Sequence, residues 1–123
     1  MQIKLSALLV LAMAGQPAAQ AAPDLEAGKR AFATCASCHQ VGRSARAGFG
    51  PHLHGVFGRK AGTTADFHYS PAMKNASIVW TEQTLAAFLK SPGDVVPGNK
   101  MRFWGMTSDE KIANLLAYLR SVQ

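Results

Sequence analysis

Two cysteines and a histidine stand together in the stretch Cys35-Ala36-Ser37-Cys38-His39. This C-x-x-C-H spacing is the pattern for covalent attachment of a c-type haem. Cysteines three apart on a helical turn point to the same side, so their thiols can meet the two vinyl groups on one haem edge. His39 shares that face and can reach under the ring as the proximal iron ligand. The motif therefore predicts one covalently bound haem c.

Three other uses of a C-x-x-C pair fit the sequence less well. A structural zinc site needs a second pair of ligands, and Cys35 and Cys38 are the only two cysteines in the chain. A redox-active pair follows a strand, whereas residues 28–34 lack a strand pattern. A structural disulfide leaves the adjacent His39 without a role. Haem attachment is the favoured interpretation.

The first residues have the features of a secretory signal peptide. Lys4 supplies a positive charge, residues 5–14 are largely apolar, and Ala19-Gln20-Ala21 offers a small-x-small cleavage site. The apolar run is short for a bilayer, which makes an uncleaved membrane anchor the weaker alternative. We expect residues 1–22 to be a cleaved signal peptide, with a mature chain that starts at Ala22 or Pro23. Residues 23–123 would then form one exported, periplasmic domain.

The chain is basic, with a formal net charge of +6. A basic surface suits an acidic protein partner, a membrane face or nucleic acid, or serves solubility alone. No basic run with interleaved aromatic residues occurs, which argues against a nucleic-acid partner.

Four capping residues indicate helices. They are Asp24, Ser70, Thr81 and Thr107. The expected helices run from about residue 25 into the haem motif, from 71 to about 75, from 82 to about 90, and from 108 onward. Pro92 should stop the third helix. Glycines and Pro51 interrupt any pattern between residues 40 and 69, where a chain that wraps a haem can stay irregular. The sequence predicts an all-α domain with long loops.

Haem iron needs a ligand on its second face, unless that site stays open for a gas or a peroxide. The methionines and histidines available in the exported domain are Met73, Met101, Met106, His52, His54 and His68. Met101 is favoured because residues 97–101 form a turn-rich loop between two helices, from which a side chain can approach the opposite face. A thioether also suits ferrous iron. Met73 and Met106 are more typical of core filling, although composition alone leaves the choice open.

Further segments accompany the haem motif in a characteristic order. They are Gly50-Pro51-His52-Leu53-His54-Gly55, Gly58-Arg59-Lys60, Phe67-His68-Tyr69-Ser70, Ile78-Val79-Trp80, Pro97 to Met101, and Leu115-Leu116-Ala117-Tyr118-Leu119. With these motifs the chain resembles the class I c-type cytochromes, in the soluble subgroup of mitochondrial cytochrome c and its bacterial relatives. The resemblance covers essentially the whole exported domain.

The resemblance implies an all-α, single-domain cytochrome c fold, with helices and long loops wrapped around one covalent haem. It implies His39 and Met101 as axial ligands, with the Pro51 carbonyl accepting a hydrogen bond from the imidazole. Further haem-pocket roles fall to Arg59, Tyr69 and Trp80 at the propionates and to Phe103 beside the exposed haem edge. The crossing of the terminal helices would involve Gly28, Phe32, Leu115 and Tyr118.

The function implied by the resemblance is electron transport by a soluble, monomeric carrier that is not an enzyme. Its expected partners are transient: membrane complexes of a respiratory chain or of photosynthesis, and periplasmic oxidoreductases. Two alternatives remain at this stage. One is a peroxidase-like haem enzyme or gas sensor with an open sixth site. The other is a permanent electron-transfer subunit of a larger oxidoreductase.

The sequence also departs from the family pattern. Phe88 and Met73 stand where a tyrosine and an asparagine are common, which makes the distal side less polar. Lysines common in mitochondrial forms are replaced by Gly93, Asp94, Thr107 and Ser108. Docking through a ring of lysines is therefore in doubt. Apolar Phe103 and Trp104 would then carry more of the contact, unless Trp104 belongs to the core.

Overall fold

A computed structural model describes residues 14–123 of the chain. Over this range the regular elements are five helices: α1 Leu25–Phe32, α2 Pro71–Lys74, α3 Glu82–Lys90, α4 Pro92–Val95 and α5 Asp109–Ser121. An isolated antiparallel bridge between Lys60 and Val79 is the one β-type pairing among these residues. The predicted all-α class with long loops is confirmed. None of the described helices is long and apolar enough to cross a membrane.

The first and last helices cross closely. An added Cβ on Gly28 of α1 would stand 2.0 Å from the carbonyl oxygen of Asn114 in α5, so only glycine permits this approach. The rings of Phe32 and Tyr118 pack at the crossing with centroids 5.6 Å apart. The Asn114 amide oxygen accepts a hydrogen bond from the backbone N–H of Asp24 at 2.8 Å. The helix crossing implied by the resemblance is present.

Three of the four expected helix caps are confirmed. Asp24, Ser70 and Thr81 each accept a hydrogen bond from a backbone N–H in the first turn of α1, α2 and α3. The expected cap of α5 was wrong: Ser108, not Thr107, accepts from the N–H of Lys111 at 3.2 Å. Both neighbours carry a hydroxyl, and the sequence pattern does not tell which of them reaches the first turn.

Two helix ends differ from expectation. Helix α1 ends at Phe32 and the haem motif follows in hydrogen-bonded turns, whereas the sequence predicted a helix that continues into the motif. Pro92 does follow the end of α3, but it also opens the short helix α4, which the sequence analysis missed. Proline suits this first helical position because the N–H it lacks would have no partner within the helix.

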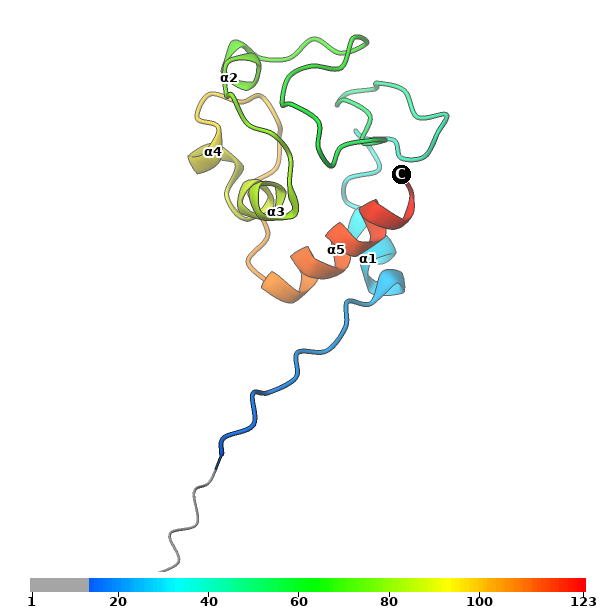
Figure 1. Ribbon diagram of the computed structural model, residues 1–123. Helices are drawn as coiled ribbons and strands as arrows, with labels where there is room; N and C mark the ends of the chain where they lie inside the picture. The colour runs from blue at the N-terminus through cyan, green and yellow to red at the C-terminus, as the bar shows by residue number, and fades with distance from the viewer. Residues whose placement is uncertain (1–13) are drawn as a thin grey trace, which may run out of the picture.

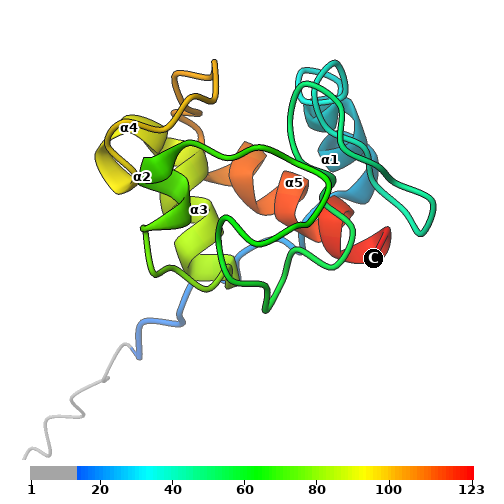
Figure 2. The same ribbon diagram turned by 90° about the horizontal axis from the view of Figure 1, so that it is seen from above.

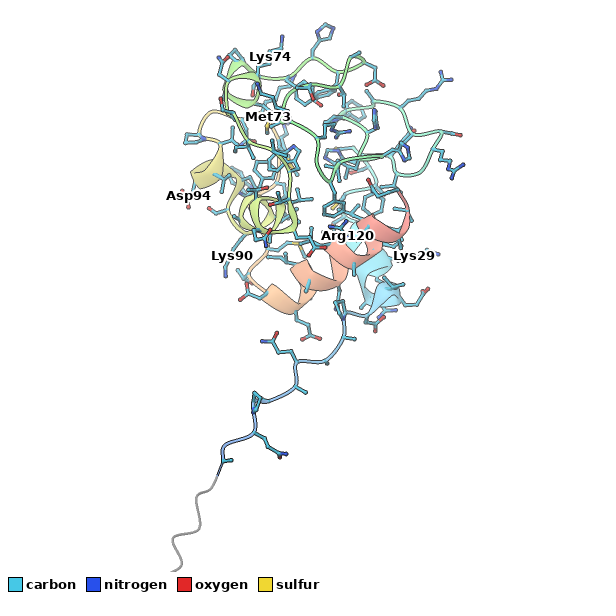
Figure 3. All side chains as sticks on the ribbon, viewed as in Figure 1. Lys29, Met73, Lys74, Lys90, Asp94 and Arg120 are labelled. Carbon is cyan, nitrogen blue, oxygen red and sulfur yellow. The ribbon has the colours of Figure 1, made fainter. Side chains whose placement is uncertain are left out.

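The elements surround a central space. In Figures 1 and 2 the loops of residues 33–70 (cyan to green) lie on one side, helices α2 to α4 on the other, and α1 with α5 below them in Figure 1. Arg120 ties α5 to α3 by a salt bridge to Glu82 at 2.8 Å, and its guanidinium lies 4.2 Å from the centroid of the Phe57 ring (Figure 3). Arg120 therefore links α5 both to α3 and to the loop that contains Phe57.

The signal peptide prediction falls largely outside the described residues. Residues 1–13 are not described, and residues 14–24 are exposed and lack regular structure. In Figure 1 this segment runs away from the helices. Cleavage before Ala22 or Pro23 stays a prediction.

Candidate cofactor site

A cavity of about 540 Å³ lies between the two sides of the molecule. This size is typical of small-molecule and cofactor sites, roughly 300–1,000 Å³. Its lining is mainly apolar and comes from segments far apart in the sequence. Eight of the nine predicted site residues line it: Cys35, Cys38, His39, Pro51, Arg59, Tyr69, Trp80 and Met101.

The haem motif forms one wall of this cavity. The backbone N–H groups of Cys38 and His39 both donate to the carbonyl of Cys35, at 3.1 and 2.9 Å, so the motif is wound as a tight turn. Both thiols are free and both line the cavity. Burial raises the pKa of the Cys35 thiol. The turn therefore presents two thiols at one edge of the cavity, as covalent haem attachment requires.

The His39 imidazole is buried and held in one orientation. Its Nδ1 lies 2.7 Å from the carbonyl oxygen of Pro51, so Nδ1–H donates and Nε2 keeps its lone pair. Burial lowers the pKa of His39, which favours the neutral ring that binds iron. A Cβ on Gly50 would stand 2.6 Å from Cε1 of the imidazole. Gly50 thus clears the space in which the ring lies.

Met101 reaches the cavity from a loop that is fixed by a neighbouring amide. The backbone N–H of Met101 donates to Oδ1 of Asn99 at 2.9 Å. Nδ2 of Asn99 donates to the carbonyls of Pro92 and Val96, at 3.1 and 2.9 Å. The Asn99 side chain therefore ties the Met101 loop to α4. Our sequence analysis missed this role, although an asparagine in a turn commonly bonds the backbone two residues on.

A polar corner of the cavity is built around Arg59. Its guanidinium donates to the carbonyls of His54 and His52, at 3.0 and 2.9 Å. Tyr69 is in hydrogen-bond contact with Thr64, with 2.6 Å between the hydroxyl oxygens. Burial lowers the pKa of Arg59, yet an arginine stays charged in proteins. Neither of the two salt bridges among the described residues involves Arg59, and the nearby Asp66 acts on it only from beyond salt-bridge distance. The corner fits a group that brings its own carboxylates.

The distal side of the cavity is apolar. Phe88 is buried against Trp80, with ring centroids 5.2 Å apart, and it lines the cavity. Met73 lines it too, and Figure 3 shows its side chain extending inward from α2. Neither residue supplies the polar group that is common at its position in the family. The site thus combines a cavity of cofactor size, two edge thiols, one imidazole, one thioether and one cationic corner, and it fits the predicted haem.

Several candidate residues lie elsewhere. Phe103 is not among the residues that line the cavity and packs half-buried against the core. Its place beside the haem edge stays a prediction. The alternative ligands His52, His54, His68 and Met106 do not line it either. Trp104 is 98% exposed, so the alternative that it belongs to the core is wrong.

Comparison with known proteins gives consistent matches. The chain matches the family model described as Cytochrome c over residues 25–123. It is 41% identical over 113 residues to cytochrome c2 of Blastochloris viridis, across 92% of this chain and 87% of that protein. It is 45% identical over 98 residues to cytochrome c of Cannabis sativa, across 79% of this chain and 88% of that protein. The solved structure of cytochrome cH from Methylobacterium extorquens aligns with a TM-score of 0.74 and 39% identity, across 80% of this chain and 98% of that one.

Proposed function

This chain belongs to the cytochrome c family, whose members are monohaem electron carriers and not enzymes, and we propose that it shuttles single electrons with His39 and Met101 as axial ligands. The family match and the Cys35–Cys38 pair together mean that its cofactor is haem c, covalently bound. The predicted family, fold and cofactor are confirmed. The ligand set, the pocket roles and the partners are the proposal.

The observation that carries the ligand assignment is the convergence of His39 and Met101 on one cavity. The imidazole comes from the haem motif and the thioether from the loop between α4 and α5. Among residues 14–123, Met73 is the one other methionine or histidine that lines the cavity. Both methionines pack against the core, but Met73 sits on helix α2, whereas Met101 sits on a loop that can present its sulfur. Two filled axial positions leave no open site for a gas or a peroxide.

Bound haem supplies the redox chemistry, in which its iron alternates between ferrous and ferric states. The protein holds both ligands in place while this happens. Pro51 fixes the imidazole of His39, and Asn99 fixes the backbone of Met101, so neither ligand has to move. Apolar residues that line the cavity, such as Phe88 and Trp80, would keep water away from the bound cofactor. Arg59, Tyr69 and Trp80 would hold the propionates at the polar corner, where Arg59 would supply the neutralising positive charge.

We also propose that the carrier is soluble and periplasmic, and that it meets its redox partners only transiently. The N-terminal pattern of residues 1–22 supports export. The match to the Blastochloris viridis protein covers 92% of the chain and so reaches into residues before the family domain. N-terminal sequencing of exported protein should give Ala22 or Pro23 as the first residue. A chain that keeps Met1 would contradict cleavage.

The ligand assignment is tested by the optical spectrum of the oxidised protein. Methionine sulfur on ferric haem gives a weak far-red band, which should be present in the wild type and absent in Met101→Ala. Met106→Ala is the matched control, because Met106 lies outside the cavity and should leave the band unchanged. Cyanide and carbon monoxide should bind slowly to the wild type. A wild type without the band that binds both quickly would overturn the carrier proposal in favour of an enzyme or sensor.

A further inference from the structure

Trp104 is almost wholly exposed, with 98% of its surface open to solvent. Scattered exposed apolar residues are common on proteins and need no explanation. A fully exposed tryptophan is more informative than other exposed apolar residues, because tryptophan is among the residues that most often carry binding energy at protein interfaces. It follows Met101 by three positions, so it is close in sequence to the cofactor cavity.

The loop holds Trp104 in this exposed position from both sides. On one side the N–H of Met101 is bound by Asn99. On the other, Gly105 adopts a φ of +117°, and a Cβ on it would stand 2.2 Å from the carbonyl oxygen of Lys90. The next N–H, of Met106, donates to the carbonyl of Leu89 at 2.8 Å. Because the backbone is pinned against α3, the exposure of Trp104 is built into the fold.

The charged side chains nearest to Trp104 in the sequence are both basic. Lys100 and Arg102 are exposed on the same loop, and both line the cavity. The Lys100 ammonium donates one of its three N–H groups to the carbonyl of His68, which leaves two for a partner. Residues 95–108 contain no acidic side chain. The acids that flank this stretch are engaged: Asp94, which lies on the outer side of α4 in Figure 3, accepts from Ser91 at 2.6 Å, and Asp109 pairs with Lys90 at 2.8 Å.

We propose that Trp104, Lys100 and Arg102 form a docking patch for a redox protein whose contact face has an apolar recess bordered by carboxylates. Trp104 is the anchor that fills the recess, and the two cations meet the carboxylates. The patch adjoins the cavity wall that Met101 contributes, which keeps the electron path short. This inference rests on the proposed electron-carrier function.

The composition of the patch fixes its response to salt. Interactions between exposed charges weaken as ionic strength rises, whereas burial of an apolar ring does not. The patch has only two cations, because the lysines common in mitochondrial forms are replaced here by Gly93, Asp94, Thr107 and Ser108. Docking through this patch should therefore retain most of its strength at high salt.

The test uses respiratory membrane vesicles of the source organism as the probe and follows the oxidation of the reduced holoprotein. Trp104→Ala should lower kcat/KM about tenfold, mainly through KM, at both low and high ionic strength. Arg102→Gln should lower it at low ionic strength only. Trp104→Phe should retain most of the wild-type value. Leu25→Ala, which removes a half-exposed apolar side chain from α1, is the control and should have no effect.

Two measurements show that the cofactor site is intact in these variants. The midpoint potential and the far-red band of Trp104→Ala should equal those of the wild type. Oxidation of Trp104→Ala at the wild-type rate would overturn the docking patch while leaving the carrier function in place. A wild type that the vesicles do not oxidise at all would overturn both.

Two other occupants of the patch would also overturn the proposal. A wild type that dimerises with concentration, while Trp104→Ala stays monomeric, would assign the patch to a second copy of the chain. Binding to protein-free anionic lipid vesicles that is lost in Trp104→Ala would assign it to a membrane surface.

Discussion

Oδ1 of Asn99 accepts a hydrogen bond from the backbone N–H of Met101 at 2.9 Å, while Nδ2 of the same amide donates to two carbonyls of the α4 segment. One side chain thus fixes the position from which the proposed distal ligand approaches the cavity. The ligand loop is also joined to the opposite side of the cavity. Lys100 donates through Nζ to the carbonyl of His68 and lies 5.0 Å from the centroid of the Phe67 ring.

Replacing Asn99 with Ala removes three hydrogen bonds from the ligand loop. We expect the free energy of unfolding to fall by about 1–3 kcal/mol and cyanide to displace the methionine faster. Denaturant unfolding and the loss of the far-red band after cyanide addition measure the two effects. Asn99→Asp keeps the acceptor for Met101 and should be less impaired in cyanide resistance. Equal cyanide rates in Asn99→Ala and the wild type would show that Met101 is held without this amide.

Gly50→Ala should disturb the proximal ligand. Its Cβ would stand 2.6 Å from the His39 ring, so the imidazole or the Pro51 loop has to shift. Overpacking of this kind costs about 1–3 kcal/mol, and we expect thermal unfolding at a lower temperature and a poorer yield of haem-loaded protein. Gly48→Ala is the matched control, since its Cβ would lie 3.5 Å from the carbonyl of Cys38, an ordinary contact. Similar behaviour of both variants would refute the steric explanation.

Gly28→Ala should destabilise the helix crossing. The new Cβ would meet the carbonyl oxygen of Asn114 at 2.0 Å, a backbone atom that cannot turn away. Helices α1 and α5 must separate, and we expect a loss of about 2–4 kcal/mol, comparable to other large core disruptions. Gly93→Ala in α4 has no atom within 4 Å of its Cβ and should be neutral or slightly stabilising. Chemical denaturation of both variants checks this prediction. A Gly28→Ala variant with the wild-type free energy of unfolding would contradict a tight crossing.

Arg59→Gln should lower the midpoint potential. A nearby cation disfavours the ferric state, which carries one more positive charge, so its removal stabilises that state. The shift should be on the order of tens of millivolts, given screened interaction of unit charges across the pocket. Lys60→Gln removes an exposed neighbouring charge and should shift the potential much less. A redox titration of both variants measures these shifts. An upward shift of the midpoint potential in Arg59→Gln would show that the Arg59 cation does not disfavour the ferric state.

Much of this protein follows from local sequence. Cys35, Cys38 and His39 define the cofactor by their spacing alone, because covalent attachment needs two thiols and a ligand on one turn. The caps Asp24, Ser70 and Thr81 were predicted correctly, since a capping side chain bonds to an N–H only a few residues away. The resemblance to the cytochromes supplied the remaining pocket residues, and all of them except Phe103 line the cavity.

Only the tertiary structure decided features that depend on segments distant in sequence. The closeness of Gly50 to His39, the outward position of Trp104 and the exclusion of Phe103 from the cavity result from how loops are pinned to helices. Spacing along the chain determines which atoms are neighbours on one turn. Packing across the fold determines which side chains meet the cofactor and which meet the solvent.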